Sequence, residues 1–142
     1  MNIEVEPKLS LSGASGASGS TGFSKARRLR KRHEFLRVQR YGVRAHTRHF
    51  VVVALAVSQE RAQSRRGGRF GVAISRRAGN AVVRNRLRRL LKEIFRRLPE
   101  APTDIVVIAK DSAGRIAKGK LHDLAAEILP GIRSASQRAA RA

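Results

Sequence analysis

Arginine and lysine dominate one stretch in the middle of the chain, from Ser75 to Arg97. The stretch reads SRRAGNAVVRNRLRRLLKEIFRR and holds nine cationic side chains against a single carboxylate, Glu93. The guanidinium group of arginine is planar and can donate two parallel hydrogen bonds to phosphate oxygens. The chemistry that this segment indicates is therefore the binding of phosphates, as on a nucleic acid.

A helix over residues 81–98 would sort these side chains onto two faces. At about 100° per residue, the apolar side chains fall on one arc, which we predict to be the core face: Val83, Leu87, Leu90, Leu91, Ile94 and Leu98. The opposite arc is a nearly continuous cationic stripe that also contains one amide: Arg84, Asn85, Arg88, Arg89, Lys92 and Arg96. Neighbouring like charges repel each other, whereas a helix that needs only solubility mixes the two signs. The pattern therefore predicts an RNA-binding face.

Two further residues extend this predicted surface, and one residue within it is not a cation. Arg76 and Arg77 lie on the connection that leads into the helix, close to the end where the helix dipole favours anions. Asn85 both donates and accepts hydrogen bonds, so it would either hold a neighbouring arginine in place or contact a ribose or a base edge.

A second basic segment, from Lys25 to Arg44, also contains nine cations and one carboxylate, Glu34. Phe35 lies within it, and two interpretations of this residue stay open. It would stack on an unpaired base if its ring were exposed, or it would pack in the core. Spacing alone favours the core.

Groups that could catalyse a reaction are not clustered in the sequence. A metal-dependent nuclease needs several carboxylates together to hold its ions, but Asp and Glu occur singly, apart from Glu4 and Glu6 near the N-terminus. His46 and His49 could ligate a metal from one loop, but they lack a third ligand. No glycine-rich phosphate loop and no set of nucleophile and base occurs. We expect no catalytic residue, no metal site and no cofactor bound by the protein alone, and a stand-alone nuclease is disfavoured.

The overall composition limits the partners and the compartment. The formal net charge is +21, and a chain this basic is expected to meet a polyanion, either nucleic acid or, as the alternative, an anionic membrane surface. No stretch approaches the roughly 20 apolar residues that span a bilayer, and the acidic first residues do not form a signal peptide. The chain has no cysteine. We expect a cytoplasmic protein that binds no membrane.

The chain divides into three predicted parts. Residues 1–22 form a Ser/Gly-rich tail that is expected to be disordered, because it has almost nothing to bury. Residues 23–130 form an RNA-binding α/β domain. Residues 131–142 are expected to be a basic flexible tail.

Within the domain, hydrophobic periodicity predicts the elements. Helices are expected over 28–41, over 81–98 with Asn80 as N-cap, and over 120–129 with Pro130-Gly131 as the stop. Strands are expected over 50–57, 69–75 and 104–109, with a further strand possible near 43–49. The strand at 69–75 has large side chains on one face and only Gly71, Ala73 and Ser75 on the other, which predicts close packing or docking there. This order of elements indicates an α/β or α+β sandwich.

The run from Gly71 to Phe95 resembles the signature of the bacterial ribonuclease P protein component. A strand that ends in Ser and two basic residues leads through Gly-Asn into a helix that bears Arg-Asn-Arg. The resemblance covers about residues 26–130 and also includes Leu29, Phe35, Gly42, Arg48, Phe50 and the strand DIVVIA at 104–109. It implies a protein that joins a catalytic RNA in the endonucleolytic removal of the 5′ leader from precursor tRNA.

The resemblance also implies roles for individual residues. The helix residues that would meet the catalytic RNA are Arg84, Asn85, Arg86, Arg88, Arg89 and Lys92, beside Arg76 and Arg77. The single-stranded leader would lie in a cleft between the first helix and the sheet, lined by Phe35, Gln39, Ser75 and Arg76. The family often has aromatic residues where this chain has Gln39 and Val53, so we expect weaker stacking, with hydrogen bonding by Gln39 instead.

The fold that the resemblance implies is a two-layer α/β (α+β) sandwich. It would contain a small mixed sheet with a left-handed βαβ crossover, like the second domain of ribosomal protein S5. Mg²⁺ would belong to the RNA-based active site of the holoenzyme, and the protein would be a monomer in a one-to-one ribonucleoprotein. The alternative is a ribosomal or ribosome-assembly RNA-binding protein without a processing role. The Gly-Asn entry into the Arg-Asn-Arg helix favours ribonuclease P.

Overall fold

The centre of the fold is a mixed four-stranded sheet. The computed structural model describes residues 27–57, 68–98 and 102–141, so the predicted tail at 1–22 lies outside the described residues. The strands are β1 (Val43–His46), β2 (Phe50–Ala56), β3 (Phe70–Ile74) and β4 (Thr103–Ala109), in the order β1-β2-β4-β3. β3 runs parallel to β4, and the other neighbours are antiparallel. The predicted strands, including the one near 43–49, are confirmed.

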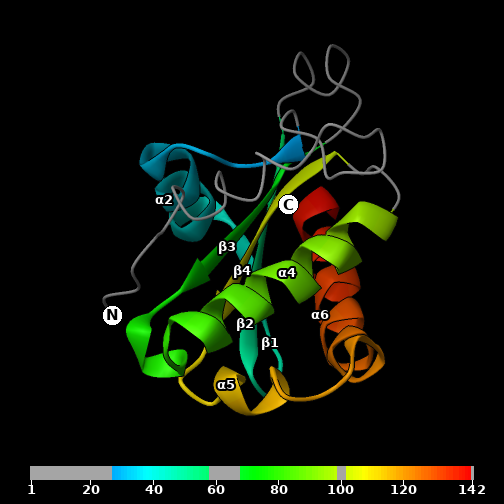
Figure 1. The fold of residues 1–142 in the computed structure, drawn as a ribbon. Coiled ribbons are helices and arrows are strands. Elements are labelled where there is room, and N and C mark those ends of the chain that lie inside the picture. Colours follow the sequence, from blue (N-terminus) through cyan, green and yellow to red (C-terminus); the bar gives the residue numbers. More distant parts are fainter. Residues whose placement is uncertain (1–26, 58–67, 99–101, 142) are drawn as a thin grey trace.

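Helices lie on both faces of this sheet. They are α2 (Arg32–Tyr41), α4 (Ala81–Arg97), the short α5 (Ala113–Ile116), which the sequence did not predict, and α6 (Leu121–Arg141). Figure 1 shows α4 and α6 on one side of the sheet and α2 on the other. The predicted α+β sandwich is confirmed, with α2 as a partial third layer. The β3–α4–β4 connection joins two parallel neighbours and follows the expected left-handed path (Figure 1).

Alternation along the strands divides the core into two clusters. Phe70, Val72 and Ile74 of β3 pack in the larger cluster with α4 and α6. Ala73 of β3 belongs to the smaller cluster, which includes Phe35 of α2. β4 contributes to both clusters and is buried along its whole length, as its almost entirely apolar sequence predicted.

The small face of β3 is covered by the ring of Phe35. This ring is fully buried, and a Cβ atom built on Gly71 would lie 2.5 Å from Phe35 Cε1. The absence of a side chain at Gly71 is therefore what lets α2 approach the sheet. The prediction that something packs closely on this face is confirmed.

The first helix begins later than predicted. Residues 28–31 are not helical, because Arg28 forms a parallel bridge with Phe70 and the Leu29 N–H donates to the Phe70 carbonyl at 2.8 Å. The helix begins at Arg32, where Glu34 Oε1 accepts hydrogen bonds from the backbone N–H groups of Lys31 (3.0 Å) and Arg30 (3.1 Å). These bonds satisfy amides that the helix start would otherwise leave without a partner.

Glu34 also ties α2 to the sheet through Arg69. Arg69 Nη1 donates to Glu34 Oε2 at 2.5 Å, and the Arg69 backbone N–H donates to Asp104 Oδ1 at 2.8 Å. Burial alone would raise the pKa of Glu34. The backbone hydrogen bonds from Lys31 and Arg30, together with the guanidinium of Arg69, outweigh that effect and lower the pKa to about 2.

The last helix does not stop at Leu129, so the predicted flexible tail at 131–142 is wrong for residues 131–141. α6 continues through Pro130, which is exposed, so the backbone hydrogen bond that proline removes lies on the solvent side. Gly131 packs closely against the β1–β2 hairpin, since an added Cβ would be 2.8 Å from Thr47 Cγ2 and 3.4 Å from Val52 Cγ2. Ile132, Ala135 and Ala139 continue the buried stripe, and tertiary packing thus overrides the local stop signal.

A carboxylate anchors α6 to the β1–β2 hairpin. Glu127 Oε2 accepts hydrogen bonds from Thr47 Oγ1 and from the His49 backbone N–H, both at 2.7 Å. The His49 ring nitrogen Nδ1 lies 2.9 Å from Ser112 Oγ.

In the described ranges, no helix is both long and apolar enough to cross a membrane.

We predict that Gly71→Ala destabilises the protein by about 1–3 kcal/mol, because the new methyl group overpacks against Phe35. Chemical denaturation would measure the free energy of unfolding. The control is Phe35→Leu, alone and combined with Gly71→Ala. The smaller side chain should make the glycine substitution less costly, so an unchanged cost in both backgrounds would contradict the contact.

We predict that Glu34→Gln destabilises the protein by about 1–2 kcal/mol at neutral pH, after allowance for solvent screening of this partly exposed carboxylate. A carboxyl group whose pKa is lowered by folding stabilises above its unfolded pKa, near 4.3, and loses that effect as the pH falls towards the folded value of about 2. The difference in unfolding free energy between the two proteins should therefore shrink over this window. A difference that stays constant from neutral pH to pH about 2 would show that the charge of Glu34 is not responsible.

Candidate nucleic-acid interface

α4 presents its side chains in a slightly different rotation from the predicted one. It begins as expected, with Asn80 Oδ1 accepting a hydrogen bond from the Val83 N–H at 3.0 Å. Phe95, which the predicted core face did not include, is buried and stacks on Phe70 with ring centroids 4.6 Å apart. This contact turns the helix, so Val83 and Leu90 are only partly buried.

The same rotation brings Arg88 inward, and its predicted place on the exposed stripe is wrong. Its relative exposure is only 4%. Arg88 Nη1 donates to Asn85 Oδ1 at 3.0 Å. Of the two roles considered for Asn85, the structure therefore shows the one in which it holds a neighbouring arginine.

Arg88, Lys92 and Arg28 form a group of cations on the flank of α4. The pKa of Lys92 is lowered, first by burial and then by the positive charges of Arg28 and Arg88. Arg28 is also buried, and its pKa is lowered by burial and by Arg30. Burial and neighbouring like charges both disfavour the charged form of a cation, and an approaching anion would favour it. Sequence reasoning did not select Arg28, although it lies in the second basic segment.

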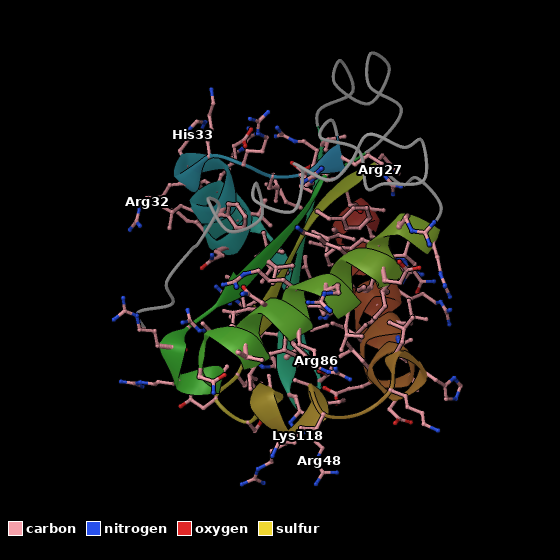
Figure 2. All side chains as sticks on the ribbon, viewed as in Figure 1. Arg27, Arg32, His33, Arg48, Arg86 and Lys118 are labelled. Carbon is pink, nitrogen blue, oxygen red and sulfur yellow. The ribbon has the colours of Figure 1, made fainter. Side chains whose placement is uncertain are left out.

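Arg86 has a structural contact that its sequence position did not reveal. Its guanidinium donates to the backbone carbonyl of Ala117, and to that of Gly119 at 3.5 Å. Figure 2 shows Arg86 above α5, on the side of the molecule where Lys118 and Arg48 also lie. Arg86 therefore fixes the connection between α5 and α6, and its remaining N–H groups are available for a ligand.

The balance of charges on the outer face of α4 changes along the helix. Arg89 is exposed and makes no hydrogen bond or ion pair with the described residues. Towards the C-terminal end, Glu93 pairs with Arg96 at 2.5 Å and with Arg97 at 3.0 Å. The pKa of Glu93 is lowered mainly by the hydrogen bond from Arg96. The part of the helix before Glu93 contains no carboxylate, and it also contains the half-buried Arg84.

The connection from β3 to α4 adds two exposed cations to this end. Arg76 and Arg77 lie on a 3-10 turn, η2 (Arg76–Ala78), after the half-buried Ser75. The turn ends at Gly79, whose φ of 154° disfavours other residues. The first turn of α4 contains no acidic residue, so the end of the helix that attracts anions is also the basic end.

The predicted leader-binding residues divide into two groups. The ring of Phe35 has no exposed face, so the expectation that it lines an open cleft is corrected, and it packs in the core as spacing alone suggested. Gln39, Ser75 and Arg76 are at least partly accessible. Gln39 Nε2 is buried and finds no acceptor in the described part of the chain.

The described residues contain no group of three or more His, Asp or Glu side chains that could hold a metal ion. His49, one of the two histidines considered as ligands, contacts Ser112 and Glu127 instead.

The family model for Ribonuclease P matches residues 23–131. The chain belongs to the ribonuclease P protein family. The ribonuclease P protein component of Desulfovibrio desulfuricans is 44% identical over 109 residues, which cover 75% of this chain and 80% of that protein. The corresponding protein of Syntrophus aciditrophicus is 36% identical over 107 residues, 73% of this chain and 82% of that protein.

Solved structures of ribonuclease P proteins have the same fold. The protein from Staphylococcus aureus matches with a TM-score of 0.64 and 27% identity, covering 78% of this chain and 96% of its own. The protein from Thermotoga maritima matches with a TM-score of 0.62 and 28% identity, covering 75% and 96%. The resemblance read from the sequence is confirmed, and this chain is a protein component of a ribonucleoprotein endoribonuclease. The ribosomal alternative receives no support from these relatives.

We predict that Arg89→Ala lowers the dependence of RNA affinity on salt, by roughly 0.7 to 0.9 log units per log unit of salt, with little change in stability. Filter binding with ribonuclease P RNA over a range of salt concentrations would measure the slope. Arg97→Ala is the matched control on the same helix, and it should change the slope less because Arg97 pairs with Glu93. Equal slopes for Arg89→Ala and the unmodified protein would remove Arg89 from the interface.

Proposed function

We propose that this protein binds the catalytic RNA of bacterial ribonuclease P and the 5′ leader of precursor tRNA, and so assists Mg²⁺-dependent removal of the leader. The observation that carries the proposal is the group of exposed cations on and before the N-terminal half of α4, formed by Arg76, Arg77, Arg86 and Arg89. RNA phosphates would offset the mutual repulsion of these like charges.

The contacts of the polar side chains on α4 support a different role for each in RNA binding. Arg89 is exposed and without a partner among the described residues, so it would meet a phosphate directly. Asn85 would keep Arg88 oriented for the same partner. Arg84 and Lys92 would continue this surface, Arg76 and Arg77 would extend it at the start of the helix, and Arg86 would use the N–H groups that its carbonyl contacts leave over.

For the leader, we assign the polar contacts to Gln39, Ser75 and Arg76. Phe35 would act as the spacer that sets the distance from α2 to β3 by its packing on Gly71. The buried amide nitrogen of Gln39 would gain a hydrogen-bond acceptor from a nucleotide. This assignment fits the sequence, which has glutamine where the family often has an aromatic residue.

The Mg²⁺ ions of the holoenzyme fit the RNA better than this protein. The described residues offer no carboxylate cluster for such an ion, so RNA phosphates would hold the metal, which supplies Lewis-acid activation of the scissile phosphate. The protein would reduce phosphate repulsion with its cations. We place it in the cytoplasm as a monomer in a one-to-one complex with the RNA.

The test is cleavage of precursor tRNA by a bacterial ribonuclease P RNA at low Mg²⁺, with and without the protein. We expect the protein to restore accurate 5′ cleavage and to be inert without the RNA, because its contribution is binding and charge neutralisation. Tight RNA binding without any rescue would contradict the processing role. Cleavage by the protein alone would contradict the assignment of catalysis to the RNA.

A further inference from the structure

A second basic surface lies at the opposite edge of the sheet from β3, which borders α4. We call it the β1-edge surface and define it by Arg40, Tyr41, Arg44 and Arg138. These four exposed residues come from three elements, since the first two end α2, Arg44 lies on the edge strand β1, and Arg138 lies near the end of α6. None of them belongs to the RNA-binding or leader-binding residues assigned above.

Backbone contacts hold two of the cations in place while leaving them exposed. Arg138 Nη2 donates to the Arg44 carbonyl at 2.5 Å, and Arg44 Nη2 donates to the Gln39 carbonyl at 2.9 Å. A guanidinium has five N–H donors, so most donors of both groups remain for a ligand. Because these side chains are already ordered, a phosphate would bind with a smaller loss of conformational entropy.

Tyr41 gives this surface a feature that charge alone does not explain. Its side chain is 65% exposed, and the guanidinium carbon of Arg40 lies 5.5 Å from the centre of its ring. An exposed aromatic ring among cations is a platform on which an unpaired base can stack. The pairing of phosphate donors with a stacking ring favours single-stranded RNA over a duplex.

The charge on this surface is not balanced by its own chain segments. Neither residues 35–57 nor residues 128–142 contain an Asp or Glu. Charged residues on an edge strand often have the sole role of preventing pairing with another strand. That role would explain Arg44 and His46 on β1. It does not explain why Arg138 reaches from α6 to the same strand, nor why the neighbouring Tyr41 is exposed.

We infer that the β1-edge surface binds the 5′-distal part of a long precursor tRNA leader. This rests on the proposed function, because the surface continues from the proposed leader residue Gln39, whose carbonyl accepts the hydrogen bond from Arg44. A leader that contacts Gln39 reaches the surface only if it extends further, past the end of α2 at Tyr41. Arg138 lies outside residues 23–131, which the family model matches.

The test uses the reconstituted holoenzyme with two precursor tRNAs, one with a leader too short to extend beyond Gln39 and one with a long single-stranded leader. Tyr41→Ala should weaken binding of the long-leader substrate about fivefold, because one base loses its stacking partner. Arg138→Ala should lower the salt dependence for that substrate by about one phosphate contact. Neither variant should change the affinity for the short-leader substrate or for the catalytic RNA.

Two controls separate stacking and position from general charge. Tyr41→Phe keeps the aromatic ring and should bind the long leader as the unmodified protein does. Arg32→Ala removes one exposed charge from the other end of α2, where Arg32 points away from the domain (Figure 2), and it should not depend on leader length. Denaturation curves of all variants confirm that each is folded.

The outcomes distinguish this inference from the proposed function. If the unmodified protein does not rescue cleavage, the proposed function fails. If it does rescue cleavage but Tyr41→Ala weakens short and long leaders equally, or neither, the inference alone is overturned. Weaker binding of the catalytic RNA by Arg138→Ala would also overturn it, because the surface would then belong to the subunit interface.

Discussion

Electrostatic self-repulsion is the constraint on which the rest of the structure depends. The chain has 31 Lys and Arg against 10 Asp and Glu, so few carboxylates are available to hold the fold together. Three of them join different elements: Glu34 links α2 to Arg69 at the start of β3, Asp104 links β4 to the same residue, and Glu127 links α6 to the β1–β2 hairpin. Because these carboxylates lie at the junctions, large areas of the surface remain uniformly positive.

Most of the cations of α4 lie before its one carboxylate, Glu93, in the sequence. On α4 the only carboxylate, Glu93, pairs with Arg96 and Arg97 near the C-terminal end, while Arg88 and Lys92 lie beside Arg28 with lowered exposure to water. Ligands that bind only the folded state stabilise it, so bound RNA should stabilise this flank more than any other part of the domain. If RNA binds this flank as proposed, stability and RNA binding would be coupled through the same side chains.

Local sequence patterns predicted the elements that depend on local physics. The cap at Asn80, the two faces of β3 and the buried β4 are all consequences of side-chain type and spacing, and the structure confirms them. The predicted end of α6 was wrong because Pro130-Gly131 stops a helix only when nothing packs beyond it. Here Gly131 fits against Thr47. The predicted exposure of Arg88 was wrong because the stacking of Phe95 on Phe70 sets the rotation of α4. In both cases the outcome depends on contacts between residues far apart in the sequence, and these contacts cannot be deduced from a single sequence.

The packing of Phe35 on Gly71 limits which groups could contact a leader between α2 and the sheet. If the ring is part of the core, recognition between α2 and the sheet must come from polar groups and from the ends of the helix. The start of α2 is fixed by Glu34 and Arg69, and its end is fixed by Arg44, which donates to a carbonyl of the last turn. α2 is thus a rigid element held at both ends. A ligand that follows it would meet the polar Gln39 first and the exposed ring of Tyr41 at its end. In the proposed arrangement the core aromatic, Phe35, would set a distance and the exposed aromatic, Tyr41, would make the contact, so the two aromatic residues of one helix would have separate functions.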